Sequence, residues 1–206
     1  SFSGNNSLDA ISVSTWVNTT FSSAGFNDNW AIIDFDRSEF FDVFVQGNGE
    51  VGFSTNANGI DDFSSTGVTV NDGNWNHIST VYNGTDKIIY VDGAEVARDT
   101  NSHGGQAMGS GTRFGFIGDG SEAGGFDGNR NGIFFDGQID NIRMFEGTTS
   151  GEWIAAEYSN QNNPGGFYST GAQTQLGGQV QYNLTNAPNN GTLFVDANGN
   201  GALDGG

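Results

Sequence analysis

The sequence predicts an all-β protein, an antiparallel β-sandwich with one short helix near residues 150–160. The strongest evidence is residues 73–97, where side chains of 75–82 alternate between two faces and Asn83-Gly84 and Asp92-Gly93 mark tight turns. Gly 34 against Pro 2 indicates many further turns, and Phe 17 with Trp 4 supplies apolar area for a core. At 206 residues with Cys 0, the chain can bury such a core without disulfides.

The remaining elements follow from the same signals. Alternation predicts strands over 11–19, 30–35, 40–46, 50–55, 113–117 and 133–145. Thr149 and Glu152 have the spacing of a capping box, which predicts a helix from Gly151 to about Asn160. Residues 56–65, 99–111 and 119–131 are polar and aperiodic, and we expect them to be loops. The expected buried residues are Trp16, Ile78, Tyr90, Ile139 and Ile142.

Several stretches resemble a known family. Asn71-Asp72-Gly73-Asn74-Trp75-Asn76-His77-Ile78, followed by Ile89-Tyr90-Val91-Asp92-Gly93, is similar to the signature of laminin G-like, concanavalin A-like jelly-roll domains. Residues 11–17 and 135–145 resemble the early and closing strands. The resemblance implies a jelly-roll domain over residues 1–170. Residues 171–206 are expected to be a β-hairpin extension or the start of a truncated next repeat, similar to repeats of large bacterial adhesins.

The charge balance limits the partners. Asp+Glu 24 against Lys+Arg 6 gives a net charge of −18, which disfavours nucleic acid and anionic membranes. No stretch is long and apolar enough to predict membrane insertion. Bound calcium would neutralise part of the excess charge. With Cys 0, these features favour an extracellular, cell-surface module of a bacterial adhesin, monomeric and cut from a longer chain.

One calcium loop is predicted near the end of the sequence. Asp196, Asn198, Asn200 and Asp204 supply oxygens at positions 1, 3, 5 and 9 of an EF-hand-type loop, with the Ala202 carbonyl at position 7. The bidentate acid of position 12 would fall one residue past Gly206. The alternative is a solvated turn without metal.

A second calcium site is implied by the family resemblance. Laminin G-like domains commonly hold calcium at the sandwich rim through an acid that opens a strand and through loop carbonyls. Asp42 falls where that acid would lie, and the resemblance implies the carbonyls of Asn56 and Met108 as ligands, with Ser110 nearby. Asp36 and Asp34 are rival acids, since alternate residues of a strand point to the same face. The alternative is that these acids only lie at a strand end on the surface.

The 119–131 loop is the predicted ligand site. It carries carboxylates, amides and one aromatic that suit the hydroxyls and apolar face of a sugar: Asp119, Glu122, Phe126, Asp127, Asn129 and Asn131. Trp30 is another possible stacking residue, although an aromatic in a β-rich chain is more often part of the core.

Three functional hypotheses remain open. The first is calcium-assisted binding of a glycan or cell-surface carbohydrate, and the second is a structural spacer stiffened by calcium. The third is a glycoside hydrolase, for which Asp34-Phe35-Asp36-Arg37-Ser38-Glu39 is the nearest match to the acid pattern of related glucanases. It lacks the leading Glu of that pattern, and neither His77 nor His103 has an evident nucleophile partner. We therefore expect a binding domain and no catalysis.

Overall fold

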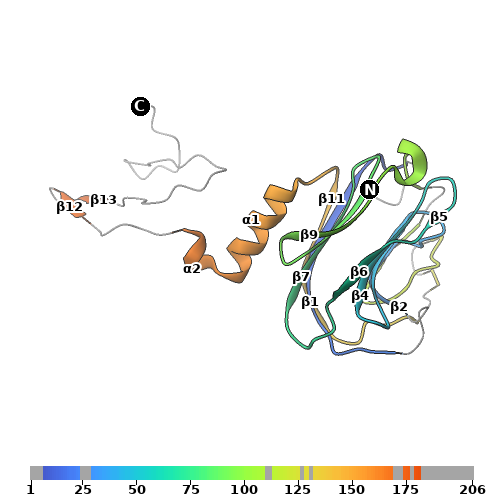
Figure 1. Ribbon diagram of the computed structural model, residues 1–206, viewed down its shortest axis with the longest axis horizontal. Helices are drawn as coiled ribbons and strands as arrows, with labels where there is room; N and C mark the ends of the chain where they lie inside the picture. Colours follow the sequence, from blue (N-terminus) through green and yellow to red (C-terminus); the bar gives the residue numbers. More distant parts are fainter. Residues whose placement is uncertain are drawn as a thin grey trace. The chain divides into compact units, whose positions relative to one another are not determined.

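The computed structural model describes residues 7–23, 29–109, 113–125, 128–129, 132–168, 174–176 and 179–181. The chain forms two compact units, Ser1–Tyr158 and Ser159–Gly206. Within the first unit, two antiparallel sheets pack face to face (Figure 1). The predicted β-sandwich is confirmed.

One sheet has five strands and contains the predicted meander. Its order is β11 (Gln138–Glu146), β1 (Ile11–Asn18), β7 (Asn76–Tyr82), β8 (Lys87–Val91) and β9 (Ala94–Asp99). The β8–β9 turn has Asp92 at φ 51° and Gly93 at φ 78°, as a two-residue hairpin turn requires. The closing strand pairs with the first strand, with Ile11 opposite Glu146.

The other sheet carries the candidate site. Its order is β10 (Phe116–Ile117), β2 (Asn29–Asp34), β3 (Phe41–Gln46), β4 (Glu50–Asn56) and β5 (Ile60–Asp61), and β6 (Ser64–Thr69) also pairs with β4. The expectation of a loop over 56–65 is wrong in part, because β5 and the start of β6 lie there. The predicted strand 113–117 is shortened to β10, and the closing strand begins at Gln138 and not at Ile133.

The core lies between the two sheets. Alternate residues of β3 enter it, and Ile78 is buried there as predicted. Ile139 and Ile142 pack against the core as predicted, but both are only partly buried. They belong to β11, an edge strand with a neighbour on one side only.

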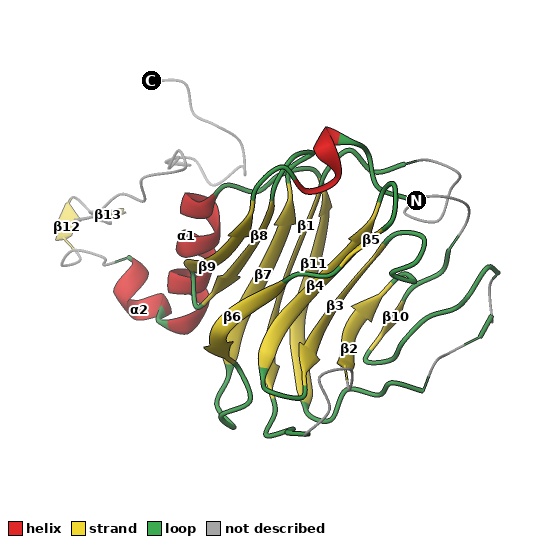
Figure 2. Ribbon diagram, turned by 45° about the vertical axis from the view of Figure 1, so that its right-hand side comes forward, coloured by secondary structure: helices red, strands yellow, loops and turns green. Residues whose placement is uncertain are grey.

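Helix α1 (Gly151–Asn162) packs on the outer face of the five-stranded sheet (Figure 2). Ile154 forms a second apolar cluster with residues of β7 and β8, and Tyr90 is buried in this cluster and not in the sandwich interior. The predicted Thr149 cap is wrong: Ser150 Oγ accepts the Trp153 N–H (3.2 Å). Trp16 stacks on Tyr158 beside the helix and stays half-buried, contrary to the prediction.

In the second unit, α2 (Pro164–Phe167) begins with Pro164, and Asn163 Oδ1 accepts the Gly166 N–H (3.1 Å). β12 (Thr174–Leu176) and β13 (Gln179–Gln181) form an antiparallel pair. None of the helices in the described part of the chain has the length and apolar character needed to cross a membrane.

Candidate functional site

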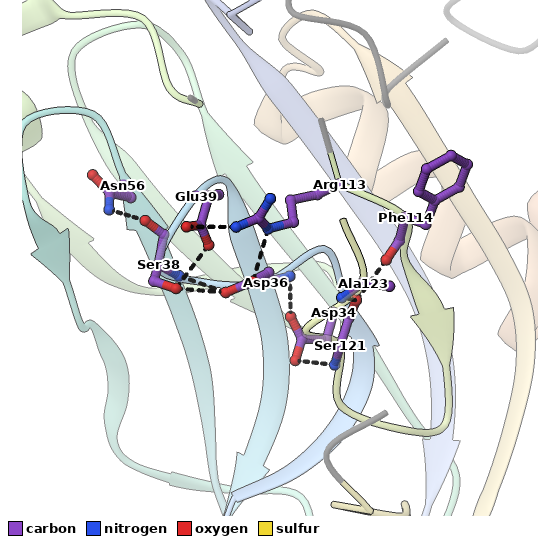
Figure 3. Close-up of polar contacts among 9 residues, drawn as sticks. All are labelled: Asp34, Asp36, Ser38, Glu39, Asn56, Arg113, Phe114, Ser121 and Ala123. Carbon is purple, nitrogen blue, oxygen red and sulfur yellow. Dashed lines mark hydrogen bonds and ion pairs between the residues drawn. The ribbon is translucent and has the colours of Figure 1, made fainter. Parts of the chain in front are cut away.

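The β2–β3 connection is a turn held by carboxylates. The Asp36 N–H donates to Asp34 Oδ1 (2.6 Å), and Ser38 donates its Oγ–H to Asp36 Oδ1 (2.6 Å) (Figure 3). Asp36 adopts φ 64°, a left-handed conformation that Asp tolerates better than most residues. The turn therefore uses both carboxylates as local hydrogen-bond acceptors.

Arg113 connects this turn to the segment before β10. Its Nε lies 2.9 Å from Asp36 Oδ2, and its NH2 group lies 2.7 Å from Glu39 Oε1. Burial alone would raise the pKa of Asp36, but the hydrogen bonds from Ser38 and the contact with Arg113 outweigh it and lower that pKa. Asp36 is thus held ionised by protein groups.

Asp34 anchors the loop that follows β10. The Ser121 N–H donates to Asp34 Oδ2 (2.9 Å), and Ser121 Oγ–H donates to the Phe114 carbonyl (2.5 Å) (Figure 3). The Phe114 N–H in turn donates to the Ala123 carbonyl (2.9 Å). The predicted loop is therefore folded, and hydrogen bonds attach its residues 119–125 to the sheet.

Of the predicted ligand residues that the structure describes, one is buried in this loop and two are exposed on it. Asp119 is buried, and its Oδ1 accepts the Gly120 N–H (2.8 Å). Glu122 and Asn129 are exposed and adjacent, since the Glu122 N–H donates to the Asn129 carbonyl (3.1 Å). Phe126, Asp127 and Asn131 lie outside the described residues.

Asp42 lies beside Asp34 in the sheet. The two are directly opposite each other on β2 and β3. Asp42 is 7% exposed, and its Oδ1 is buried with no hydrogen-bond partner in the described part of the chain. Leaving a carboxylate oxygen in this state is costly, which makes this atom the clearest unsatisfied group near the site.

Burial has the largest effect on the pKa of both Asp34 and Asp42. It raises the pKa of Asp34 from 3.8 to about 6, against the opposing effect of the Ser121 and Asp36 N–H groups. Burial, and secondly the charge of Asp34, raise the pKa of Asp42 well above 3.8. Asp62 and Arg37 also act on Asp42, in opposite directions. A cation between Asp34 and Asp42 would favour the ionised form of both.

The other residues of the expected rim site lie close to one another. The Gly109 N–H donates to the Asn56 carbonyl (2.9 Å), and the Met108 carbonyl accepts the Leu8 N–H (2.7 Å). Both carbonyls therefore already have one donor. The remaining residues of the two expected metal sites fall outside the described part of the chain: Ser110, Asp196, Asn198, Asn200, Ala202 and Asp204.

A metal site here would need more than side chains. No group of three or more His, Cys, Asp or Glu residues that could hold an ion occurs among the described residues. Calcium takes six to eight oxygens, commonly including carbonyls and water. The Asp34–Asp42 pair fits as the anionic part of such a shell, and Asp36 is committed to Arg113.

Sequence reasoning missed Arg113 and Ser121 as parts of the site. Arg113 could have been singled out by scarcity, because only six Lys and Arg accompany 24 acids. Ser121 carried no comparable signal, since its role depends on a contact across 87 residues of sequence.

Comparison with known families agrees with this architecture. Residues 2–155 match a laminin G-type model described as the concanavalin A-like lectin/glucanases superfamily. The chain belongs to this superfamily. No curated protein sequence matches it.

Solved structures of this superfamily fold resemble the chain at low identity. The heptameric SAP-like pentraxin of Limulus polyphemus has a TM-score of 0.56 and 14% identity, over 74% of this chain and 71% of the pentraxin. The binding domain of Paraclostridial Mosquitocidal Protein 1 has a TM-score of 0.55 and 13% identity, over 75% of this chain and 38% of that one. A structure of botulinum neurotoxin type C has a title that concerns interaction with two ganglioside molecules. Its TM-score is 0.50 and its identity 12%, over 73% of this chain and 35% of the neurotoxin chain. The chain thus spans less than half of either toxin chain, and the likeness concerns the fold.

Proposed function

We propose that this chain is a non-enzymatic carbohydrate-binding domain whose ligand contacts the 119–129 loop and whose binding is assisted by calcium. The observation that carries the proposal is the attachment of this loop to Asp34, next to the unsatisfied Asp42 oxygen. An ion that binds the two acids would stabilise the base of the loop. Its exposed rim would then be held in one conformation for a ligand.

The chemistry of the rim suits a neutral sugar. Glu122 and Asn129 are exposed side by side and offer carboxylate and amide groups to hydroxyls. A net charge of −18 disfavours polyanionic ligands. The printed title of the neurotoxin structure concerns ganglioside, and we extend only the ligand class, carbohydrate, to this chain.

We propose calcium as the cofactor of the two buried acids. Asp34 and Asp42 would supply carboxylate oxygens, and carbonyls and water would complete the shell. Calcium binding would also reduce the self-repulsion of a chain with 24 acids and six Lys and Arg. We place the domain outside the cell, in a bacterial surface adhesin, on the same grounds of acidity and absence of Cys.

Catalysis is not supported by the arrangement of the acids. A retaining or inverting glycosidase needs two carboxyl groups available on either side of the scissile bond. Both oxygens of Asp34 accept backbone N–H groups, and Asp36 and Glu39 share Arg113. These carboxylates are engaged in holding the turn and the loop.

The proposal is tested by screening the protein for binding to immobilised neutral glycans. One screen contains calcium at about 2 mM, close to its extracellular concentration, and the other contains EDTA. We expect calcium-dependent binding that is lost in the double variant Glu122→Ala/Asn129→Ala. Glu152→Ala, which removes an exposed acid on α1, is the matched control and should bind normally. A calcium-dependent rise in melting temperature with no glycan bound would instead support the spacer function.

A further inference from the structure

Another exposed surface lies on the outer face of the five-stranded sheet, next to the part that α1 covers. We define the Trp75 surface by five residues from the ends of three neighbouring strands: Trp16, Asn18, Trp75, Gln138 and Asp140. We propose that this surface binds one neutral pyranose ring, with Trp75 as the stacking platform. The proposal takes its ligand class from the proposed function but uses a different site.

The strand register places these residues on one face. Trp16 lies opposite His77 on β7 and Asp140 on β11, and Asn18 lies opposite Gln138. Trp75 is two residues before His77, and a period of two puts both on the same side of the sheet. That side is the outer one, because the rings of Trp16 and His77 both contact Tyr158 of α1.

Helix α1 covers only part of this face. It contacts the sheet through Ile154 and Glu157, and Tyr158 stacks on the ring of Trp16 at the border of the Trp75 surface. Beyond Tyr158, Trp75 is 44% exposed and Gln138 and Asp140 are exposed. The indole of Trp75 is therefore partly exposed, with Asn18 on the neighbouring strand β1 and Gln138 and Asp140 one strand further on β11.

The backbone that carries Trp75 is fixed. The Gly73 N–H donates to the Thr19 carbonyl (3.0 Å), and Asn18 Nδ2 donates to the Gly73 carbonyl (2.9 Å). The Asn74 N–H donates to Asp72 Oδ1 (2.9 Å). These bonds hold the segment on both sides of the turn, so that little ordering would remain to oppose binding.

The chemistry of the surface selects the ligand. The face of an indole carries partial negative charge, which attracts the C–H groups of a pyranose face, while neighbouring amides and carboxylates hydrogen-bond its hydroxyls. A nucleic-acid base could also stack, but such sites need a positive groove, and Arg143, the cation of β11, is paired with Glu157. Trp153, 40% exposed, differs because its ring already packs against Phe145 at 5.6 Å.

The test uses NMR of the intact chain, whose four tryptophans give four indole N–H signals. The probes are methyl glycosides of glucose, galactose, mannose and N-acetylglucosamine, titrated to about 100 mM, a range that covers millimolar affinities. We expect at least one probe to shift the Trp75 signal saturably. Trp75→Ala should weaken that probe's binding about tenfold, and Trp75→Phe by less, because a smaller ring is retained. Trp153→Ala should leave binding unchanged.

The outcomes separate the two sites. A Trp75 shift that persists in Glu122→Ala/Asn129→Ala supports the second site whatever happens at the loop. Binding of immobilised glycans that is lost in Glu122→Ala/Asn129→Ala, with the Trp75 signal unchanged, would leave the proposed function standing and overturn this inference. The absence of any Trp75 shift with all four probes, or equal loss in Trp153→Ala and Trp75→Ala, would also overturn it.

Discussion

At the residue scale, the environment of Asp34 has opposing effects on the ionisation of its carboxyl group. Two backbone N–H groups favour its ionised form, and burial opposes ionisation. Burial prevails, since the pKa rises to about 6. Burial therefore makes the ionised carboxylate of Asp34 costly at neutral pH. A bound cation would favour that ionised form.

This predicts a pH-dependent effect of Asp34→Asn. Between pH 4 and 6 the folded wild type holds a proton on Asp34 that the unfolded chain releases, so the contribution of Asp34 to stability falls as pH rises. A shift from 3.8 to about 6 corresponds to about 2–3 kcal/mol. The stability difference between wild type and Asp34→Asn should therefore be more favourable to wild type at pH 4.5 than at pH 7, measured by urea unfolding.

The comparison must be between variants, because His77 acts oppositely. Burial lowers the pKa of His77 from 6.5 to about 4, so its contribution to stability rises with pH over much of the same range. His77 is present in both proteins and cancels in the difference. An equal difference at both pH values would contradict the raised pKa of Asp34.

Arg113 provides a second test at this scale. It joins Asp36 and Glu39 to the segment before β10 and is partly buried, whereas Arg37 pairs with Asp62 at an exposed position. We expect Arg113→Ala to lower the free energy of unfolding by about 1–3 kcal/mol and Arg37→Ala by less than about 1 kcal/mol. Chemical denaturation of both variants measures the two losses. Equal losses would mean that Arg113 has no bridging role.

At the element scale, the attachment of α1 to the sheet depends on a buried acid. Glu157 accepts a hydrogen bond from Ser14 Oγ (3.3 Å), pairs with Arg143, and lies 3.8 Å from His77 Nε2. Ile154 fills the apolar cluster one turn earlier. One face of α1 thus combines an apolar anchor with a polar one.

Glu157→Ala should therefore loosen α1. Removing Glu157 deprives Ser14 of its buried acceptor and Arg143 of its partner, and because the Arg143 side chain is 40% exposed and solvated, we expect a loss of about 1–2 kcal/mol in unfolding free energy. Near-UV circular dichroism should also change, since Trp16 stacks on Tyr158 of the same helix. Glu152→Ala, exposed in the first turn of the same helix, is the control and should leave the near-UV signal unchanged and cost less than about 1 kcal/mol. A Glu157→Ala protein as stable as Glu152→Ala would show that the apolar contacts suffice.

At the scale of the whole molecule, a net charge of −18 implies repulsion among the acids that opposes the compact state. Added salt screens repulsion between the 24 acids, and an ion that binds the native state specifically adds stabilisation by mass action. We expect millimolar calcium to raise the melting temperature more than sodium at equal ionic strength, measured by differential scanning calorimetry.

Asp42→Asn locates the calcium-specific part of this effect. The variant should keep the response to sodium and lose most of the additional response to calcium. Equal shifts by the two salts in the wild type would reduce the effect to screening. A calcium response that survives Asp42→Asn would place the ion elsewhere in the chain.

The sequence by itself determined most of the strands, the hairpin turns of the meander and the likeness to the superfamily, but not β5 or the start of β6. The 73–97 meander and the Asp92-Gly93 turn depend on local alternation and on residues that tolerate positive φ, so neighbours along the chain are enough to define them. The same local logic predicted α1, although it assigned the cap to Thr149 and not to Ser150.

Tertiary structure decided which face of each strand is covered and which acids meet. The register of β1 and β7 sets Trp16 opposite His77, so that Trp16 and Ile78 lie on opposite faces and α1 packs over the face that carries Trp16. The register of β2 and β3 sets Asp42 directly opposite Asp34, a pairing that the alternation of either strand does not contain. Asp34 and Ser121 are 87 residues apart, and the bond between them exists only because β10 pairs with β2. Such contacts depend on how strands pair across the whole chain, and no local pattern contains that information.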